Sequence, residues 1–281
     1  MKINKQPVSF QKKYHLPPLL ADFLDRALPL WQEDARILAV AAGGSFITRE
    51  MDEFSDLDLI IAVTPEALPD IMKERSKIAG RAGKLLMAFT GEHVGESRLL
   101  ICLYGPPLLH VDLKFVALPD AAERVEDPVI LWERDNCLTK VLQKSRPHYP
   151  MPDLQWIEDR FWVWIHYVAG KIGRGELLEA YDNLSFLRLN VLGPMALMAS
   201  GGRPSGVRKI ETYAKDYLPD LLNTLADYQP LSCVRALLAA VKLYLVLRNK
   251  LEDKTLVKHI KVENAVMLYL NEIEKKVSVN N

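Results

Sequence analysis

The sequence predicts an α+β fold in which a mixed β-sheet flanked by helices is followed by an all-helical bundle. Two observations predict this class. Short apolar runs typical of strands alternate with helical patterns over roughly the first 144 residues. Beyond a proline-rich stretch at 144–153, only helical periodicity remains. We therefore expect one domain at 1–147 and a second, helical domain at 148–281.

Local patterns predict the individual elements, and glycine and proline mark the turns between them. In the first domain we expect helices at 18–32 and 65–80, strands at 36–42, 57–63, 84–90, 97–103 and 108–116, and a hairpin turn at 91–96. In the second we expect helices at 153–172, 175–199, 207–225, 230–251 and 255–277.

Composition narrows the function classes. The 281 residues include 36 basic and 36 acidic side chains, so a net charge of zero argues against a protein that binds nucleic acid mainly by neutralising phosphates. The three cysteines form no CxxC pair, so neither a disulfide framework nor a zinc site is expected. The basic N-terminus is not followed by the apolar core of a secretory signal, and we find no apolar run of roughly 18 residues. We expect a cytoplasmic protein with no membrane partner.

The stretch GGSFITREMDEFSDLDLI at 43–60 carries the most chemical information. Residues at i and i+2 of a strand project from one face, so Asp56 and Asp58 are expected to point the same way. Two carboxylates this close repel each other unless a cation lies between them. Ligands that are all oxygen favour Mg²⁺ or Mn²⁺.

A second strand repeats this pattern, because His110, Asp112 and Lys114 share one face of the run LLHVDLKFV. If the two strands are neighbours, Asp56, Asp58 and Asp112 converge and can hold two divalent ions, which clamp an in-line phosphoryl or nucleotidyl displacement. The Gly43-Gly44 turn lets backbone N–H groups approach a phosphate chain without a Cβ in the way.

These residues resemble the nucleotidyltransferase superfamily that includes DNA polymerase β. Its signature is a Gly-Ser turn, about ten residues, a D-h-D strand and a later strand Asp, and the matching positions here are Gly44, Ser45, Asp56, Asp58 and Asp112. Residues 161–184 are also similar to the helical half of the aminoglycoside 6-adenylyltransferases, also called streptomycin adenylyltransferases. The matching positions there are Phe161, Trp162, Tyr167, Val168, Ala169, Arg174, Glu176, Ala180, Asp182 and Leu184.

The resemblance implies transfer of AMP from ATP, with two Mg²⁺ ions, to a hydroxyl of a small molecule such as an aminoglycoside. It implies that Asp56 and Asp58 bind both metals and Asp112 one, and that Gly43, Gly44 and Ser45 hold the triphosphate. Asp182 matches a family carboxylate that takes the proton from the acceptor hydroxyl. The first domain is then catalytic and the second binds the acceptor.

One position departs from the family pattern. Where the family usually has Arg directly after the Gly-Ser pair, this chain has Phe46, and Arg49 is the candidate to replace it in binding phosphate. This difference from the family pattern is expected to affect the affinity for the triphosphate or the identity of the substrate. Two alternatives stay open: adenylylation of a protein, as in toxin–antitoxin nucleotidyltransferases, and a nucleotide-binding module without catalysis.

Overall fold

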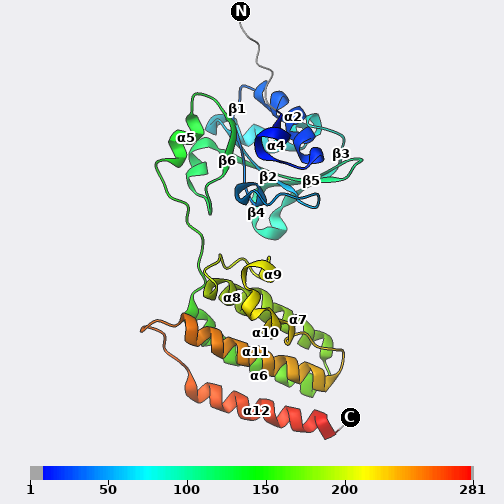
Figure 1. Ribbon diagram of the computed structural model, residues 1–281, viewed down its shortest axis with the longest axis vertical. Helices are drawn as coiled ribbons and strands as arrows, with labels where there is room; N and C mark the ends of the chain where they lie inside the picture. The colour runs from blue at the N-terminus through cyan, green and yellow to red at the C-terminus, as the bar shows by residue number, and fades with distance from the viewer. Residues whose placement is uncertain (1–8, 280–281) are drawn as a thin grey trace, which may run out of the picture. The chain divides into compact units, whose positions relative to one another are not determined.

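A computed structural model describes residues 9–279 of the chain. The chain forms two compact units, one ending at Tyr149 and the next beginning at Pro150 (Figure 1). The predicted proline-rich stretch lies at this junction, where residues 146–153 form no helix or strand. The catalytic and acceptor-binding roles given to residues 1–147 and 148–281 stay predictions.

A six-stranded sheet forms the centre of the N-terminal unit, in the order β3-β4-β5-β2-β1-β6. The strands are β1 (Ile37–Ala42), β2 (Leu57–Val63), β3 (Leu85–Gly91), β4 (Glu96–Tyr104), β5 (Leu109–Ala117) and β6 (Val129–Glu133). β2 and β5 pair in parallel, and every other pairing is antiparallel. The mixed sheet that the sequence predicts is therefore confirmed.

The two faces of the sheet are covered differently, because side chains alternate along each strand. Leu57, Leu59 and Ile61 are buried in the larger core, against α2 (Pro18–Gln32) and α4 (Leu68–Arg81). On the opposite face only a small cluster is covered, by the 3₁₀ turn η3 (Leu118–Ala122) and α5 (Cys137–Leu142), over small strand residues such as Ala39, Ala41 and Ala62. Part of this second face therefore stays open.

The five predicted strands of the N-terminal unit are confirmed to within about a residue at each end, and so is the helix at 18–32. β6 and α5 are not among the predicted elements. The expected hairpin turn contains the short η2 (Glu92–Val94), which ends at Gly95 with a φ of +76°. The short α1 (Phe10–Tyr14) precedes α2.

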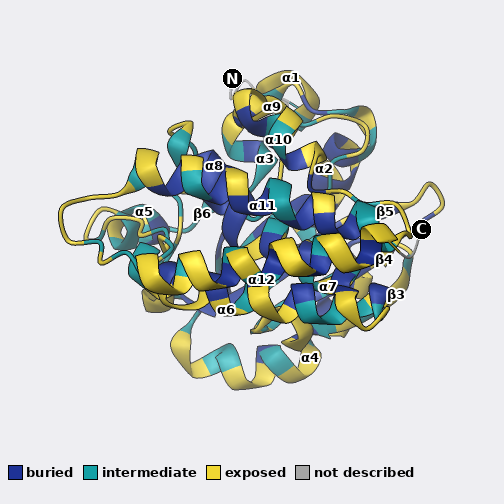
Figure 2. Cartoon of the chain, turned by 90° about the horizontal axis from the view of Figure 1, so that it is seen from below, coloured by how far each residue is buried: buried dark blue, intermediate teal, exposed yellow. Residues whose placement is uncertain are grey.

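In the C-terminal unit the main helices are α6 (Leu154–Gly173), α7 (Leu177–Leu187), the shorter α8 (Gly193–Ala199), α11 (Pro230–Leu251) and α12 (Ile260–Val279). Asp153 begins α6, since its carboxylate accepts hydrogen bonds from the backbone N–H groups of Gln155 and Trp156. The helices carry buried residues along one side and exposed residues along the other (Figure 2). Such amphipathic faces place one shared apolar core between the helices.

Three helix predictions need correction. The helix expected at 207–225 is broken into α9 (Ile210–Tyr213), η5 (Lys215–Tyr217) and α10 (Leu218–Leu222). The helix expected at 175–199 contains a π-helical turn at Arg188–Leu192, just before Pro194, whose missing N–H prevents an ordinary α-helical bond there. The last helix begins at Ile260 and not at residue 255.

The central helix α11 is the most apolar long helix among the described residues, although Arg235 and Lys242 interrupt its apolar run. By length and composition, Pro230–Leu251 could span a membrane. Half of its most apolar window is buried inside the unit, however. Cys233, Leu237 and Tyr244 contribute to the core that the surrounding helices share. Its apolar character is that of a core helix.

Candidate active site

Two carboxylates lie side by side on the open face of the sheet. Asp58 on β2 and Asp112 on β5 are direct partners in the parallel register. Partners in register project to the same side of a sheet, so their side chains are neighbours. The two strands are therefore neighbours, which is the condition for Asp58 and Asp112 to converge. Asp56 precedes the first residue of β2, so it leads into the strand and is not part of it.

Burial and two neighbouring residues, His110 and Asp56, affect the pKa of the Asp112 carboxyl. Burial raises the pKa of the Asp112 carboxyl above its ordinary value. The imidazole of His110, whose Nε2 lies 2.9 Å from Asp112 Oδ1, counteracts this rise, and the negative charge of Asp56 adds to it. The pKa of Asp112 thus reflects burial first, then the contact with His110, and last the charge of Asp56.

The glycine turn after β1 lies directly against Asp58. The backbone N–H of Gly43 donates to the carbonyl oxygen of Asp58 at 2.8 Å. Gly44 has a φ of +56°, and a Cβ at this position would lie 2.1 Å from Asp58 Oδ2. Only glycine fits this turn, because any other side chain would overlap the carboxylate.

Glu126 is a fourth acidic residue at this turn, and sequence reasoning missed it. Its Oε1 accepts a hydrogen bond of 3.1 Å from the backbone N–H of Gly44. A carboxylate here occupies an N–H group that the resemblance gives to the triphosphate. Nothing in the local sequence marks Glu126, because the contact joins residues 82 positions apart.

Ser45 and Arg49 belong to the short α3 (Ser45–Thr48) and its end. The Ser45 hydroxyl lies 2.9 Å from Met51 Sδ. Arg49 is exposed and lines a smaller pocket of about 140 Å³ with Tyr14 and His15. Phe46 also lines this pocket, is buried and packs edge-on against the Tyr14 ring with 5.0 Å between centroids. The residue that replaces the family's usual Arg is thus a core residue here.

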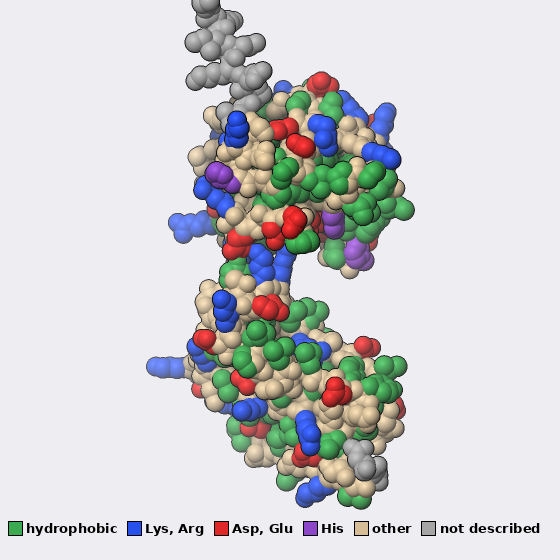
Figure 3. Space-filling view, turned by 45° about the vertical axis from the view of Figure 1, so that its right-hand side comes forward, with side chains coloured by type: hydrophobic (Ala, Val, Ile, Leu, Met, Phe, Trp, Pro, Cys, Tyr) green, Lys and Arg blue, Asp and Glu red, His purple; other side chains and the backbone are tan. Residues whose placement is uncertain are grey.

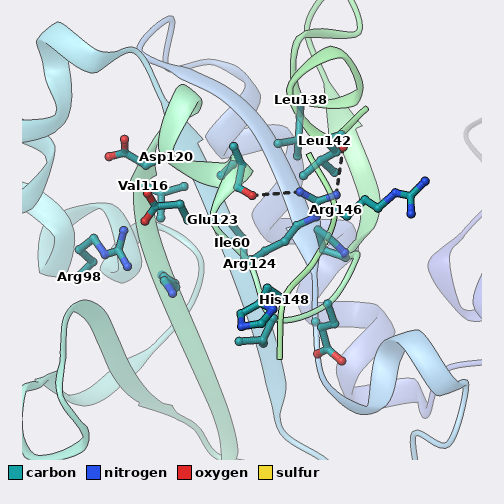
Figure 4. A pocket seen from close by; sticks show the side chains of 17 residues that line it. Ile60, Arg98, Val116, Asp120, Glu123, Arg124, Leu138, Leu142, Arg146 and His148 are labelled. Atoms are coloured by element: carbon teal, nitrogen blue, oxygen red, sulfur yellow. Dashed lines mark hydrogen bonds between the residues drawn. The ribbon is translucent and has the colours of Figure 1, made fainter. Parts of the chain in front are cut away.

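A pocket of about 530 Å³ opens beside the carboxylates, on the same face of the sheet. Its floor contains Ile60 and Val116, which follow Asp58 and Asp112 by two and four positions on β2 and β5. Leu138 and Leu142 of α5 form one wall and residues 120–126 another (Figure 4). Gly43 and Glu126 also line it, so the pocket reaches the glycine turn.

Three of the four Lys and Arg side chains that line the pocket form ion pairs, two of them with the same carboxylate. Glu96 pairs with Arg98 at 2.7 Å and with Lys114 at 2.8 Å. These contacts, the Arg98 hydrogen bond above all, lower the pKa of Glu96 to about 2. Arg124 binds Asp127 at 2.6 Å and donates to the carbonyl oxygens of Leu142 and Ser145. Arg124 thereby connects the loop that contains it to the C-terminal end of α5.

On the other side of Asp112 the same face becomes apolar. The register continues from Asp112 to Ile101 on β4 and then to Phe89 on β3, and from His110 to Leu103 and Met87. Met87 and Phe89 are at least half exposed. Figure 3 shows a broad hydrophobic patch on the N-terminal unit with histidine side chains at its border. The carboxylates thus lie between this patch and the pocket.

The donor set suits a divalent metal in its chemistry, because Asp56, Asp58 and Asp112 offer only oxygen atoms. Within residues 9–279, however, no group of three or more His, Cys, Asp or Glu side chains is gathered tightly enough to enclose an ion. One oxygen of Asp112 is engaged by His110.

Asp182 lies in the other unit, exposed on α7. Its neighbour Glu179 is bound by Lys171 Nζ at 2.9 Å and by the Tyr167 hydroxyl, and Glu176 is bound by the same lysine at 2.7 Å. These contacts lower the pKa of Glu179. Of the three acidic residues on this segment, Asp182 is the one outside the Lys171 cluster.

Aromatic side chains lie one turn beyond Asp182. Phe186 packs edge-on against Trp164 with 5.2 Å between ring centroids, and Trp164 lies 5.6 Å from Trp156. Trp156 is 46% exposed, and Arg160 lies over its ring at 4.2 Å. Trp162, by contrast, is fully buried in the helical core.

A mixed sheet with a glycine turn, a strand-borne carboxylate row and a following helical unit defines the nucleotidyltransferase class of enzymes. The family model of streptomycin adenylyltransferase matches residues 21–273. This chain therefore belongs to the streptomycin adenylyltransferase family, and it is a nucleotidyltransferase.

Two solved structures are similar in fold. An aminoglycoside 6-adenyltransferase from Bacillus subtilis is 20% identical, covers 89% of this chain and 97% of its own, and has a TM-score of 0.41. A nucleotidyltransferase-like protein from Exiguobacterium sibiricum is 14% identical, with coverages of 91% and 88% and a TM-score of 0.38. No curated protein matches the chain.

Proposed function

We propose that the protein transfers AMP from MgATP to a hydroxyl of a small acceptor, an aminoglycoside above all, and releases pyrophosphate. The observation that carries the proposal is the register pair of Asp58 and Asp112, with the Gly43-Gly44 turn against Asp58. This arrangement puts carboxylate oxygens that can bind a metal beside the glycine turn, which the family resemblance gives to the phosphate chain. Family membership supplies adenylyl transfer as the reaction.

In this proposal the residues of the sheet hold the donor. Asp56 and Asp58 would hold two Mg²⁺ ions and Asp112 one of them, and the backbone of Gly43, Gly44 and Ser45 would hold the triphosphate. The ions, when bound, neutralise charge on the reacting phosphate. The chain's own contribution is to position the α-phosphate and to stabilise charge around it.

The acceptor oxygen forms a bond to the α-phosphorus, the bond from that phosphorus to the β-phosphate oxygen breaks, and pyrophosphate leaves. We assign the acceptor's proton to Asp182, because its carboxylate is exposed and outside the Lys171 cluster that engages Glu176 and Glu179. A carboxylate there also attracts an acceptor amine. We place this reaction in the cytoplasm.

The test is Mg²⁺-dependent release of pyrophosphate from ATP across a panel of aminoglycosides, with product masses recorded. The proposal expects at least one acceptor to gain the mass of AMP as pyrophosphate appears. A protein adenylyltransferase would instead label protein in a lysate and no aminoglycoside. Binding of MgATP without transfer to either class of acceptor would indicate a nucleotide-binding module. The retained row of carboxylates argues against that last reading.

A further inference from the structure

We propose that strand β3 pairs in the antiparallel sense with β3 of a second copy of this chain, which joins the two sheets into one. β3 (Leu85–Gly91) is the end strand of its sheet, and among residues 9–279 its strand partner is β4 alone (Figure 1). Alternate backbone N–H and C=O groups of an end strand point away from the sheet and can pair with another strand. Such an association goes beyond the proposed reaction and depends on no step of it.

The two edges of the sheet differ in how well they are protected. At the other edge, β6 has five residues, each at least partly buried, and Glu133 accepts hydrogen bonds from the backbone N–H and the hydroxyl of Thr139 on α5. β3 has seven residues and contains neither a charged residue nor a proline. Charges, prolines and covering helices keep edge strands from pairing. β3 is therefore the edge that is open to another strand.

Apolar side chains are exposed along this open edge. On β3, Leu86 is 46%, Met87 61% and Phe89 50% exposed. Leu103 on β4, the register partner of Met87, is 38% exposed. Contiguous exposed apolar surface of this kind marks interaction sites, because covering it removes apolar area from water. Pairing two copies through β3 covers these side chains on both of them.

A two-fold axis through Ala88 gives a register in which the two copies complement each other. Met87 then lies opposite the copy's Phe89, and a thioether beside an aromatic ring is a favourable contact. Lys84, just before the strand, lies opposite the copy's Glu92, just after it, and both are exposed. The two-fold axis repeats each contact, so two opposite-charge pairs flank the apolar centre.

This charge pattern identifies a second copy as the occupant. A shift of two residues is the smallest that keeps each side chain on its face of the joined sheet. Such a shift would place Lys84 opposite Thr90 or Val94 and would separate it from Glu92. The register through Ala88 is therefore the one that joins the apolar residues and the charges at the same time. In this register the carboxylate rows of both copies lie on the same side of the joined sheet.

Two irregularities in β3 limit the length of the pairing. The register with β4 shifts between Leu85 and Met87 and again between Thr90 and Gly91, so the regular part is Met87–Thr90. The pairs nearest the axis lie within this part. Bulges bend and twist a strand beyond its regular part, which makes the new pairing short. We therefore expect a dimer that dissociates on dilution.

Sedimentation velocity on the full chain tests the pairing between about 1 and about 100 µM, the range in which dimers with micromolar dissociation constants assemble. We expect wild type to dimerise. Met87→Lys should raise the dissociation constant roughly tenfold or more, because it puts a charge at the apolar centre. The matched control is Leu268→Lys on α12, at a residue that is 67% exposed, which should associate like wild type. Melting temperatures establish that each variant is folded.

A charge exchange tests the register. Lys84→Glu and Glu92→Lys each put like charges opposite each other, and each should weaken the dimer roughly threefold to tenfold. The double variant restores opposite charges and should return the dissociation constant towards that of wild type.

A wild-type protein that stays monomeric at about 100 µM would overturn the inference and would leave the edge of β3 to a different partner. A dimer that Met87→Lys does not weaken would also overturn it. So would losses in the two charge variants that add up in the double variant. None of these results depends on adenylyl transfer, which the pyrophosphate assay tests separately.

Discussion

Asp58 and Asp112 are direct register partners on the two parallel strands of an otherwise antiparallel sheet. The pairing brings together carboxylates that are 54 positions apart in the sequence, on the sheet face that helices leave open. An antiparallel arrangement would run the two strands in opposite directions and change every partner. The parallel pairing of β2 with β5 is therefore the structural basis of the site.

Replacing Asp112 with Asn should raise thermal stability in the absence of Mg²⁺. Burial and the charge of Asp56 raise the pKa of Asp112, so its ionised form is disfavoured in the folded state, and a neutral amide relieves that cost. A group whose pKa is raised on folding destabilises the protein as the pH rises through the ordinary and then the raised value. We expect Asp112→Asn to melt a few °C higher than wild type at about pH 7.

The same comparison at pH 3 should show little difference, because wild-type Asp112 is protonated there. Mg²⁺ with ATP should stabilise wild type and not Asp112→Asn, as thermal shift would record. Equal stabilisation of both proteins by MgATP would show that Asp112 binds no metal.

Gly44→Ala should abolish turnover. The new Cβ would lie 2.1 Å from Asp58 Oδ2, which forces the turn or the carboxylate to move. The positive φ adds strain of roughly 1 kcal/mol or more to the folded state. Steady-state rates and melting curves would measure the two effects.

Gly95→Ala is the matched control, since Gly95 also has a positive φ, of +76°, but no atom within 4 Å of the new Cβ. This variant should share the strain and keep its activity. If both glycine variants stay active, the close approach of Gly44 to Asp58 is not needed for catalysis.

Asp182→Asn should lower the rate of transfer by roughly 10²–10⁴-fold, the usual contribution of a general base. MgATP affinity should remain that of wild type, because Asp182 is assigned to the acceptor. Asp216→Asn, an exposed carboxylate on η5 of the same unit, should leave both quantities unchanged. A loss of MgATP affinity with an unchanged single-turnover rate would remove Asp182 from the role of base.

The stability of the helical unit should depend strongly on Glu158. This carboxylate is 1% exposed and accepts hydrogen bonds from Tyr244, from Arg248 at 3.1 Å and from the backbone N–H of His259 at 3.0 Å. Glu158→Ala would leave Arg248 buried with one fewer partner, at a cost of about 3–5 kcal/mol. Glu252→Ala removes a more exposed pair with Lys258 and should cost less than about 1 kcal/mol.

The pH dependence of unfolding provides a second measure of Glu158. Burial alone would raise its pKa, but the bonds from Tyr244, His259 and Arg248 lower it below the ordinary value of 4.5. Its contribution to stability is therefore present above pH 4.5 and is lost as the pH falls through the lowered pKa. Urea melts should show a shallower acid loss for Glu158→Gln than for wild type; parallel curves would contradict this account.

Local patterns predicted the sheet well where each strand alternates clearly. The strand at 57–63 is predicted to the residue, because buried Leu57 and Leu59 alternate with Asp58 and Ile60. The strand at Val129–Glu133 was missed because it is short and its pairing partner is β1, far away in the sequence. Likewise, apolar residues recur at helical spacing over 207–225, but this segment forms several short helices and no single long one.

Local sequence patterns likewise predict only part of the candidate site. Asp56, Asp58, Asp112 and Gly44 are marked by spacing on and around strands, and the structure places Asp112 and Gly44 beside Asp58. The position of Glu126 depends on a loop fold that no local pattern specifies. The pocket similarly requires the contact between η3 and α5, which only the folded unit creates.

Transfer of radiolabel from α-³²P-ATP to an acceptor, with wild type and Asp58→Asn compared at saturating Mg²⁺, tests the central claim most directly. The amide keeps the shape of the carboxylate and removes one anionic metal ligand beside the glycine turn. We predict that wild type labels an aminoglycoside and releases pyrophosphate in equal amounts, while Asp58→Asn is folded and at least about a hundredfold slower. An Asp58→Asn variant that transfers label at the wild-type rate would contradict the assignment of the site.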